Sequence, residues 1–149
     1  MTETEKDDLF YVCSLIEFIG RKTRNKRKDI VNALGEQGIQ KQLYDAQVNH
    51  CLTFEQVSDE LIEYYQIANG EFDTISDCQY KIPSFTSIGK LYSYMVLDCS
   101  EKGKEVAELL KIFNSFISDE ISDFRTGVYF ENPSYLEHSY QEGHLLEQI

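Results

Sequence analysis

The sequence of 149 residues contains no tryptophan, only two prolines and four cysteines. The scarcity of proline favours long helices, because proline breaks a helix interior. Packing must therefore depend on the ten tyrosines and nine phenylalanines. No apolar run reaches the roughly 20 residues that a membrane helix needs. The first ten residues are acidic and lack the pattern of a secretion signal, so we expect a cytoplasmic protein.

The four cysteines include no C-x-x-C pair. In a reducing compartment scattered cysteines are usually free thiols, and we expect buried free thiols here. The spacing of His50, Cys51, Cys78 and Cys99 matches no common zinc pattern, so the sequence predicts no metal and no cofactor. Glycine-rich phosphate loops, G-x-S-x-G elbows and kinase signatures are also missing, which favours a protein without enzymatic activity. Whether Cys51, its neighbour His50 or the acids near Asp119 have a chemical role stays open.

Basic residues are few, and they are concentrated in one place. The chain has 14 Lys and Arg against 26 Asp and Glu, for a net charge of −12. Six of the bases lie in the segment 21–28, which holds no acid: Arg21, Lys22, Arg24, Lys26, Arg27 and Lys28. A globally acidic protein is a poor non-specific binder of nucleic acid, because binding to phosphates needs a basic face.

Hydrophobic periodicity predicts an all-α fold of about six or seven helices. The predicted helices cover 7–22, 25–34, 39–44, 53–67, 84–98 and 104–124, and a last helix follows Asn132 and Pro133. Short extended pieces are expected near 79–82 or 128–130. We expect one domain, 1–149, with a subdivision into 1–70 and 80–149 as an alternative.

Two local signals stand out. Thr53 is followed three residues later by Gln56, the pattern of a reciprocal helix cap. Gly35 and Gly38 bracket a predicted turn between two short helices, and helix, short turn, helix is compatible with a DNA-binding helix-turn-helix. An ordinary pair of core helices fits the same pattern. In either case Tyr44 is predicted to point inward.

Residues 9–66 resemble a family of small bacterial domains, the DUF3791-like proteins. The resemblance rests on core positions from Phe10 to Leu34, on Leu43, Tyr44 and His50, and on the run from Phe54 to Glu60. It implies an antitoxin or accessory component of a toxin–antitoxin gene pair. Residues 80–149 lie outside it.

The leading hypothesis is a protein-interaction module that binds a basic protein partner, because the body of the chain is strongly acidic. The predicted partner contacts are Tyr64, Tyr65, Tyr92 and Tyr94. The alternative is nucleic-acid binding through the six bases of the segment 21–28 and the helix pair after it. A homodimer is a further open alternative, and no membrane partner is expected.

Overall fold

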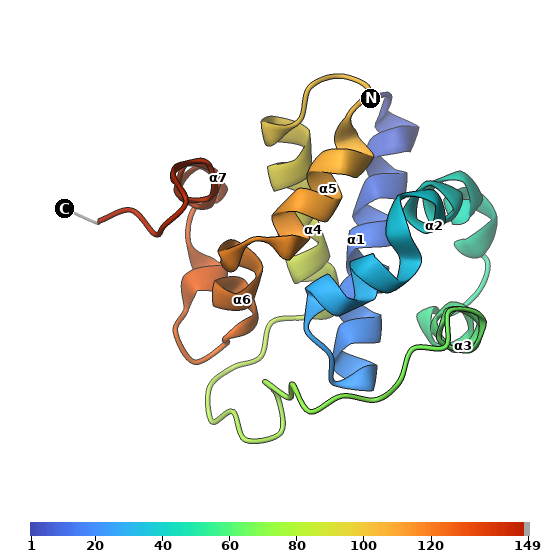
Figure 1. Cartoon of the computed structure of the whole chain (residues 1–149), viewed down its shortest axis with the longest axis horizontal. Coiled ribbons are helices and arrows are strands. Elements are labelled where there is room, and N and C mark those ends of the chain that lie inside the picture. The colour runs from blue at the N-terminus through green and yellow to red at the C-terminus, as the bar shows by residue number, and fades with distance from the viewer. Residues whose placement is uncertain (148–149) are drawn as a thin grey trace.

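The computed structural model describes residues 1–147, and all regular secondary structure in this part of the chain is helical (Figure 1). The elements are α1 (Glu3–Thr23), α2 (Arg27–Asn49), α3 (Phe54–Tyr64), α4 (Phe85–Cys99), α5 (Glu105–Asn114), α6 (Phe116–Ser122), the 3-10 turn η1 (Val128–Phe130) and α7 (Pro133–Glu142). The predicted all-α class and helix number are confirmed. The segments expected to be extended are a loop at 79–82 and a 3-10 turn at 128–130.

Helix α1 is the centre of the molecule. It begins four residues earlier than predicted, because the Thr2 hydroxyl accepts the Glu5 N–H at 3.1 Å and the Glu5 carboxylate accepts the Thr2 N–H at 3.2 Å. Every residue from 11 to 17 is buried, and α2, α3 and α4 all pack against this helix. The helix ends at Arg24, whose backbone is left-handed (φ 57°).

Helix α4 approaches α1 closely at a glycine. A Cβ atom added to Gly89 would lie 2.1 Å from Ser14 Oγ and 2.6 Å from Ser14 Cα. Glycine in a helix interior costs about 1 kcal/mol relative to alanine. Here that cost is offset by the close packing of two central helices, because only a residue without a side chain fits.

Helix α2 differs from its prediction. The chain bends at one residue, Gly35 (φ 70°, ψ 177°), and continues as a helix to Asn49. The predicted turn between Gly35 and Gly38 is therefore a one-residue kink, and no separate short helix ends at Tyr44. Gln42, which the helix-turn-helix alternative would use to contact bases, is only 3% exposed. The structure thus gives no support to a helix-turn-helix at this place.

Helix α3 begins as its sequence predicts. The Thr53 hydroxyl accepts the Gln56 N–H at 3.1 Å, and the Gln56 side chain accepts the Thr53 N–H at 3.0 Å. The helix ends at Tyr64, three residues before the predicted end. The loop that follows is fixed to the end of α1, because the Gly70 N–H donates to the Thr23 carbonyl at 2.8 Å.

The predicted helix 104–124 is broken into α5 and α6. At Ser115 the backbone is extended (ψ 167°), and the Ser115 hydroxyl donates to the Ile112 carbonyl at 2.6 Å. Serine competes in this way with helical hydrogen bonds, which explains the break. The predicted apolar stripe is still buried on both sides of it, as Leu109, Phe113 and Ile121 show.

Buried side chains from α1 to α7 form one hydrophobic core, to which residues 1–70 and 80–149 both contribute. The packing of α4 on α1 joins these two parts of the chain. Helices α3 and α7 lie on opposite sides of the molecule (Figure 1). Among the described residues, no helix combines the length and the apolar character needed to cross a membrane.

Candidate functional site

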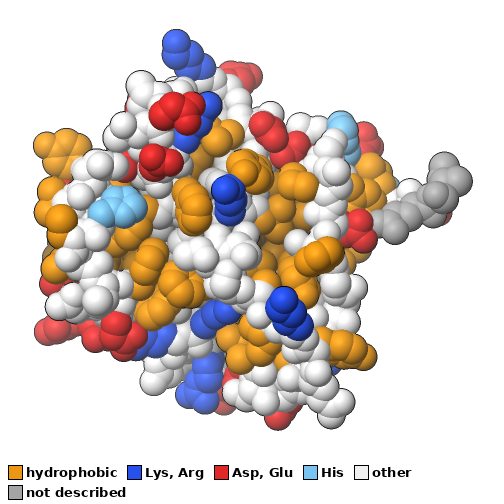
Figure 2. Space-filling model, turned by 180° about the vertical axis from the view of Figure 1, so that it is seen from behind, with side chains coloured by type: hydrophobic (Ala, Val, Ile, Leu, Met, Phe, Trp, Pro, Cys, Tyr) orange, Lys and Arg blue, Asp and Glu red, His pale blue; other side chains and the backbone are white. Residues whose placement is uncertain are grey.

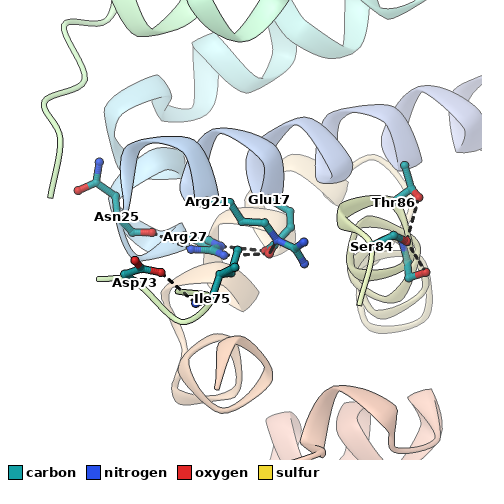
Figure 3. Close-up of polar contacts among 9 residues, drawn as sticks. Glu17, Arg21, Asn25, Arg27, Asp73, Ile75, Ser84 and Thr86 are labelled. Atoms are coloured by element: carbon teal, nitrogen blue, oxygen red, sulfur yellow. Dashed lines mark hydrogen bonds and ion pairs between the residues drawn. The ribbon is translucent and has the colours of Figure 1, made fainter. Parts of the chain in front are cut away.

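Two arginines of the basic segment neutralise one buried carboxylate. Glu17 of α1 is 1% exposed and Arg27 of α2 is 2% exposed. Arg27 donates from Nε and Nη2 to the two oxygens of Glu17, each at 2.8 Å, and Arg21 Nε donates to Glu17 Oε2 at 2.7 Å (Figure 3). Burial by itself raises the pKa of Glu17, but the charges and hydrogen bonds of Arg27 and Arg21 hold it below its ordinary value. Arg27 belongs to the core, so its prediction as a nucleic-acid contact is wrong.

Other bases of the segment also make contacts within the protein. Lys22 binds two carboxylates of α3. The Lys26 ammonium lies 5.7 Å from the ring centroid of Phe72. Within residues 1–147, only Arg24 and Lys28 of this segment make neither an ion pair within 4 Å nor a cation–π contact. The six bases of the segment 21–28 therefore do not form one basic face, which weakens the nucleic-acid alternative.

The four predicted tyrosines do not form one surface. Tyr92 is fully buried, stacks on Phe113 with ring centroids 4.0 Å apart, and donates its hydroxyl to Ser118 at 2.9 Å. Its prediction as a partner contact is wrong, because it is a core residue. Tyr94 is 42% exposed on the outer side of α4. Tyr64 is 77% exposed at the end of α3 and makes an edge contact with Tyr65, which is half-buried.

The most exposed tyrosine is one that the sequence predicts to be inward. Tyr44 is 88% exposed, and Val48, one turn later on α2, is 72% exposed. The inward face of this part of α2 carries Ile39, Gln42 and Ala46 instead. The spacing of these three residues is that of one helix face and could have predicted which side of α2 is buried. The pattern is difficult to recognise because a polar glutamine occupies one of the buried positions.

Two grooves flank the C-terminal half of α2. The groove toward α3 has a volume of about 260 Å³, and its lining includes Lys41, Asp45, Glu60 and Tyr64. The groove toward the start of α1 has a volume of about 330 Å³, and its lining includes Glu5, Asp8, Leu43 and Tyr44. The two linings contain four acids and one base, Lys41, which donates to Asp45 at 2.8 Å. We call Tyr44, Val48 and Tyr64 with these two grooves the α2 surface.

Hydrophobic side chains reach the surface elsewhere too. Figure 2 shows one face of the molecule on which they gather in several patches between acidic and basic side chains. A separate cleft of about 400 Å³ is lined by acids that include Asp73 of the loop after α3, Asp119 of α6 and Asp123, which follows α6. No three His, Cys, Asp or Glu side chains within residues 1–147 are placed to hold a metal ion. The four cysteines are free, but only Cys13 is buried as expected, whereas Cys51 is exposed and Cys78 and Cys99 are half-buried.

Comparison of the chain with protein-family models, with curated proteins and with solved structures found no match.

Proposed function

We propose that this protein is a non-enzymatic interaction module, of the antitoxin or accessory kind, and that its α2 surface binds a basic protein partner. The observation that carries the proposal is the exposure of three large side chains on adjacent helices. Tyr44, Val48 and Tyr64 are 88%, 72% and 77% exposed. Tyrosine is enriched at protein interfaces because its ring is apolar and its hydroxyl remains able to hydrogen-bond.

The shape of the α2 surface suits a helix or an extended segment of the partner. Tyr44 and Val48 stand on a ridge, and a groove lies on each side of that ridge. Apolar side chains of the partner would cover the ridge, and neighbouring side chains would enter the grooves. Such helix-in-groove contacts place most of their binding energy in a few buried anchors.

The charge of the α2 surface supports the proposal of a basic partner. Its grooves are lined by Asp45, Glu60, Glu5 and Asp8, and Lys41 is already paired. Arginine and lysine side chains of a partner would complement these carboxylates. The net charge of −12 would also accelerate encounter with a basic protein at low salt. A second copy of this acidic surface would instead bring like charges together, which disfavours a homodimer through it.

The test is capture of the partner by tagged protein from its native cells at low salt, after nuclease treatment. The purified partner is then titrated into the wild-type protein and into the double variant Tyr44→Ser/Val48→Ser. Loss of two contact residues of this size is expected to weaken binding by roughly 30-fold or more. Binding to the wild type should also weaken as salt is raised.

The matched control is Tyr80→Ser, which removes a 66% exposed tyrosine outside the α2 surface and should leave binding unchanged. Equal affinity of the wild type and the Tyr44/Val48 variant would refute the proposal. Capture that disappears on nuclease treatment, and that also depends on Arg24 and Lys28, would support the nucleic-acid alternative instead.

A further inference from the structure

A second concave site lies apart from the α2 surface, where α1, α2, α3 and α4 meet. It is a cleft of about 500 Å³, lined by Asp7, Phe10 and Tyr11 of α1, by Gln47 and His50 at the end of α2, by Phe54 of α3 and by Thr86 of α4. Its lining shares no residue with the two grooves of the α2 surface. The volume is within the range of sites that bind small molecules.

One wall of the cleft is aromatic. The ring of Tyr11 lies 4.6 Å from the ring of His50 and 5.1 Å from that of Phe54, measured between centroids. Phe54 extends this cluster to the half-buried Phe85 of α4, with ring centroids 4.8 Å apart. Because these rings pack on one another, the wall is held rigid and needs little rearrangement to receive a ligand.

The hydroxyl of Tyr11 is buried without a partner. Tyr11 is 4% exposed, and its oxygen makes no hydrogen bond within the described part of the chain. An unpartnered buried hydroxyl costs about 1–3 kcal/mol, and native proteins contain few of them. A tyrosine beside a cleft whose buried hydroxyl lacks a hydrogen-bond partner points to a ligand that makes this hydrogen bond.

The charge of the lining selects the kind of ligand. Asp7 provides a carboxylate, and it lies one turn before Tyr11 on the same side of α1. The lining residues of this cleft include no lysine or arginine. The ring of Phe10 already makes a cation–π contact, with the ammonium of Lys90 at 5.8 Å from its centroid, so the rings left for a ligand are those of Tyr11, His50 and Phe54.

We propose that this cleft binds a small amphiphilic ammonium ion, that is, a protonated amine on a compact hydrocarbon or aromatic body. The rings of Tyr11, His50 and Phe54 cover the body. The Asp7 carboxylate balances the charge, and the Tyr11 hydroxyl accepts a hydrogen bond from the amine. This inference is independent of the proposed protein partner.

The test compares three probes of similar shape by NMR titration of the labelled protein: the phenethylammonium ion, the neutral 2-phenylethanol and the anionic 3-phenylpropionate. We expect the ammonium ion to bind at least about tenfold more tightly than the alcohol. The anion should bind more weakly still. Resonances of Tyr11, His50 and Phe54 should shift.

Two substitutions assign the contacts. Tyr11→Phe removes only the unpartnered hydroxyl, so it should weaken binding of the ammonium ion about tenfold without lowering the unfolding temperature. Asp7→Asn should remove most of the preference for the ammonium ion over the alcohol. Tyr80→Phe and Asp29→Asn, which change an exposed tyrosine and an exposed aspartate elsewhere, are the controls.

Several results would overturn the inference. These are no binding of the ammonium ion up to its solubility, equal binding of the ion and the alcohol, or unchanged affinity in Tyr11→Phe.

Discussion

The buried ion pair of Glu17 with Arg27 makes a sharp prediction about stability. Arg27→Met keeps a long apolar side chain at a position that is 2% exposed, but it removes the guanidinium. Glu17, 1% exposed, then loses two of its three charge-assisted hydrogen bonds and keeps only that of Arg21 at 2.7 Å. The substitution therefore tests the cost of an incompletely paired buried charge.

Breaking a buried pair by removing one partner costs about 3–5 kcal/mol, because the remaining charge stays desolvated. We expect Arg27→Met to lie near the lower limit, about 3 kcal/mol, since Arg21 still neutralises part of the charge. The double variant Glu17→Gln/Arg27→Met removes both charges and should be more stable than Arg27→Met alone.

Urea unfolding measures both effects, and the midpoint should fall without a change in slope. Arg125→Met is the control, because Arg125 pairs with Asp123 at the exposed surface and its loss should leave the midpoint unchanged. The reasoning is refuted if Arg27→Met unfolds at the wild-type midpoint, or if the double variant is no more stable than the single one.

Two further predictions concern the contacts of α4, with α1 at Gly89 and with Glu137 of α7 at Asp98. Gly89→Ala places a Cβ atom 2.6 Å from the backbone of Ser14, so we expect a loss of about 3 kcal/mol in thermal unfolding, and an unchanged melting temperature would contradict this packing. Burial raises the pKa of Glu137 from 4.5 to about 8, and a hydrogen bond to Asp98 is the second cause of this increase. The folded state therefore binds this proton more tightly than the unfolded chain does, and the resulting stability is lost as pH rises from about 4.5 to 8. As pH rises over that interval, Glu137→Gln should therefore become more stable relative to the wild type, by on the order of 1 kcal/mol after allowance for solvent screening. Unfolding midpoints of the two proteins at pH 5, 7 and 9 measure this difference. A difference that is constant with pH would exclude the shift.

Helix starts could be predicted where the signal is contained in one turn. Thr53 and Gln56 cap α3 as expected, and Asn132 caps α7 by accepting the Ser134 N–H at 2.8 Å. The break at Ser115 was missed because the apolar stripe continues across it. Periodicity reports which face is buried, and it does not report whether the backbone hydrogen bonds are continuous.

The candidate site was predicted less well than the fold. Tyr92 and Tyr94 are two residues apart on α4, yet one is fully buried and the other is exposed. Composition does not separate them, but helical periodicity does, because Tyr92 lies in the buried stripe with Ile88 and Met95 and Tyr94 lies outside it. Tyr44 was predicted to face inward because it is large and aromatic. The residue that faces inward is Gln42, two positions earlier, whose polar side chain gave no sign of burial.

The sequence by itself determined the helical class, the caps of α3 and α7 and the buried stripes, because these depend on residues within a few positions of one another. Only the tertiary structure decided what the basic segment does. Glu17 and Arg27 are ten residues apart, and their pairing requires α2 to pack back on α1. A charge in a sequence can face solvent or a buried partner, and its free energy depends on which of the two surrounds it in the folded chain.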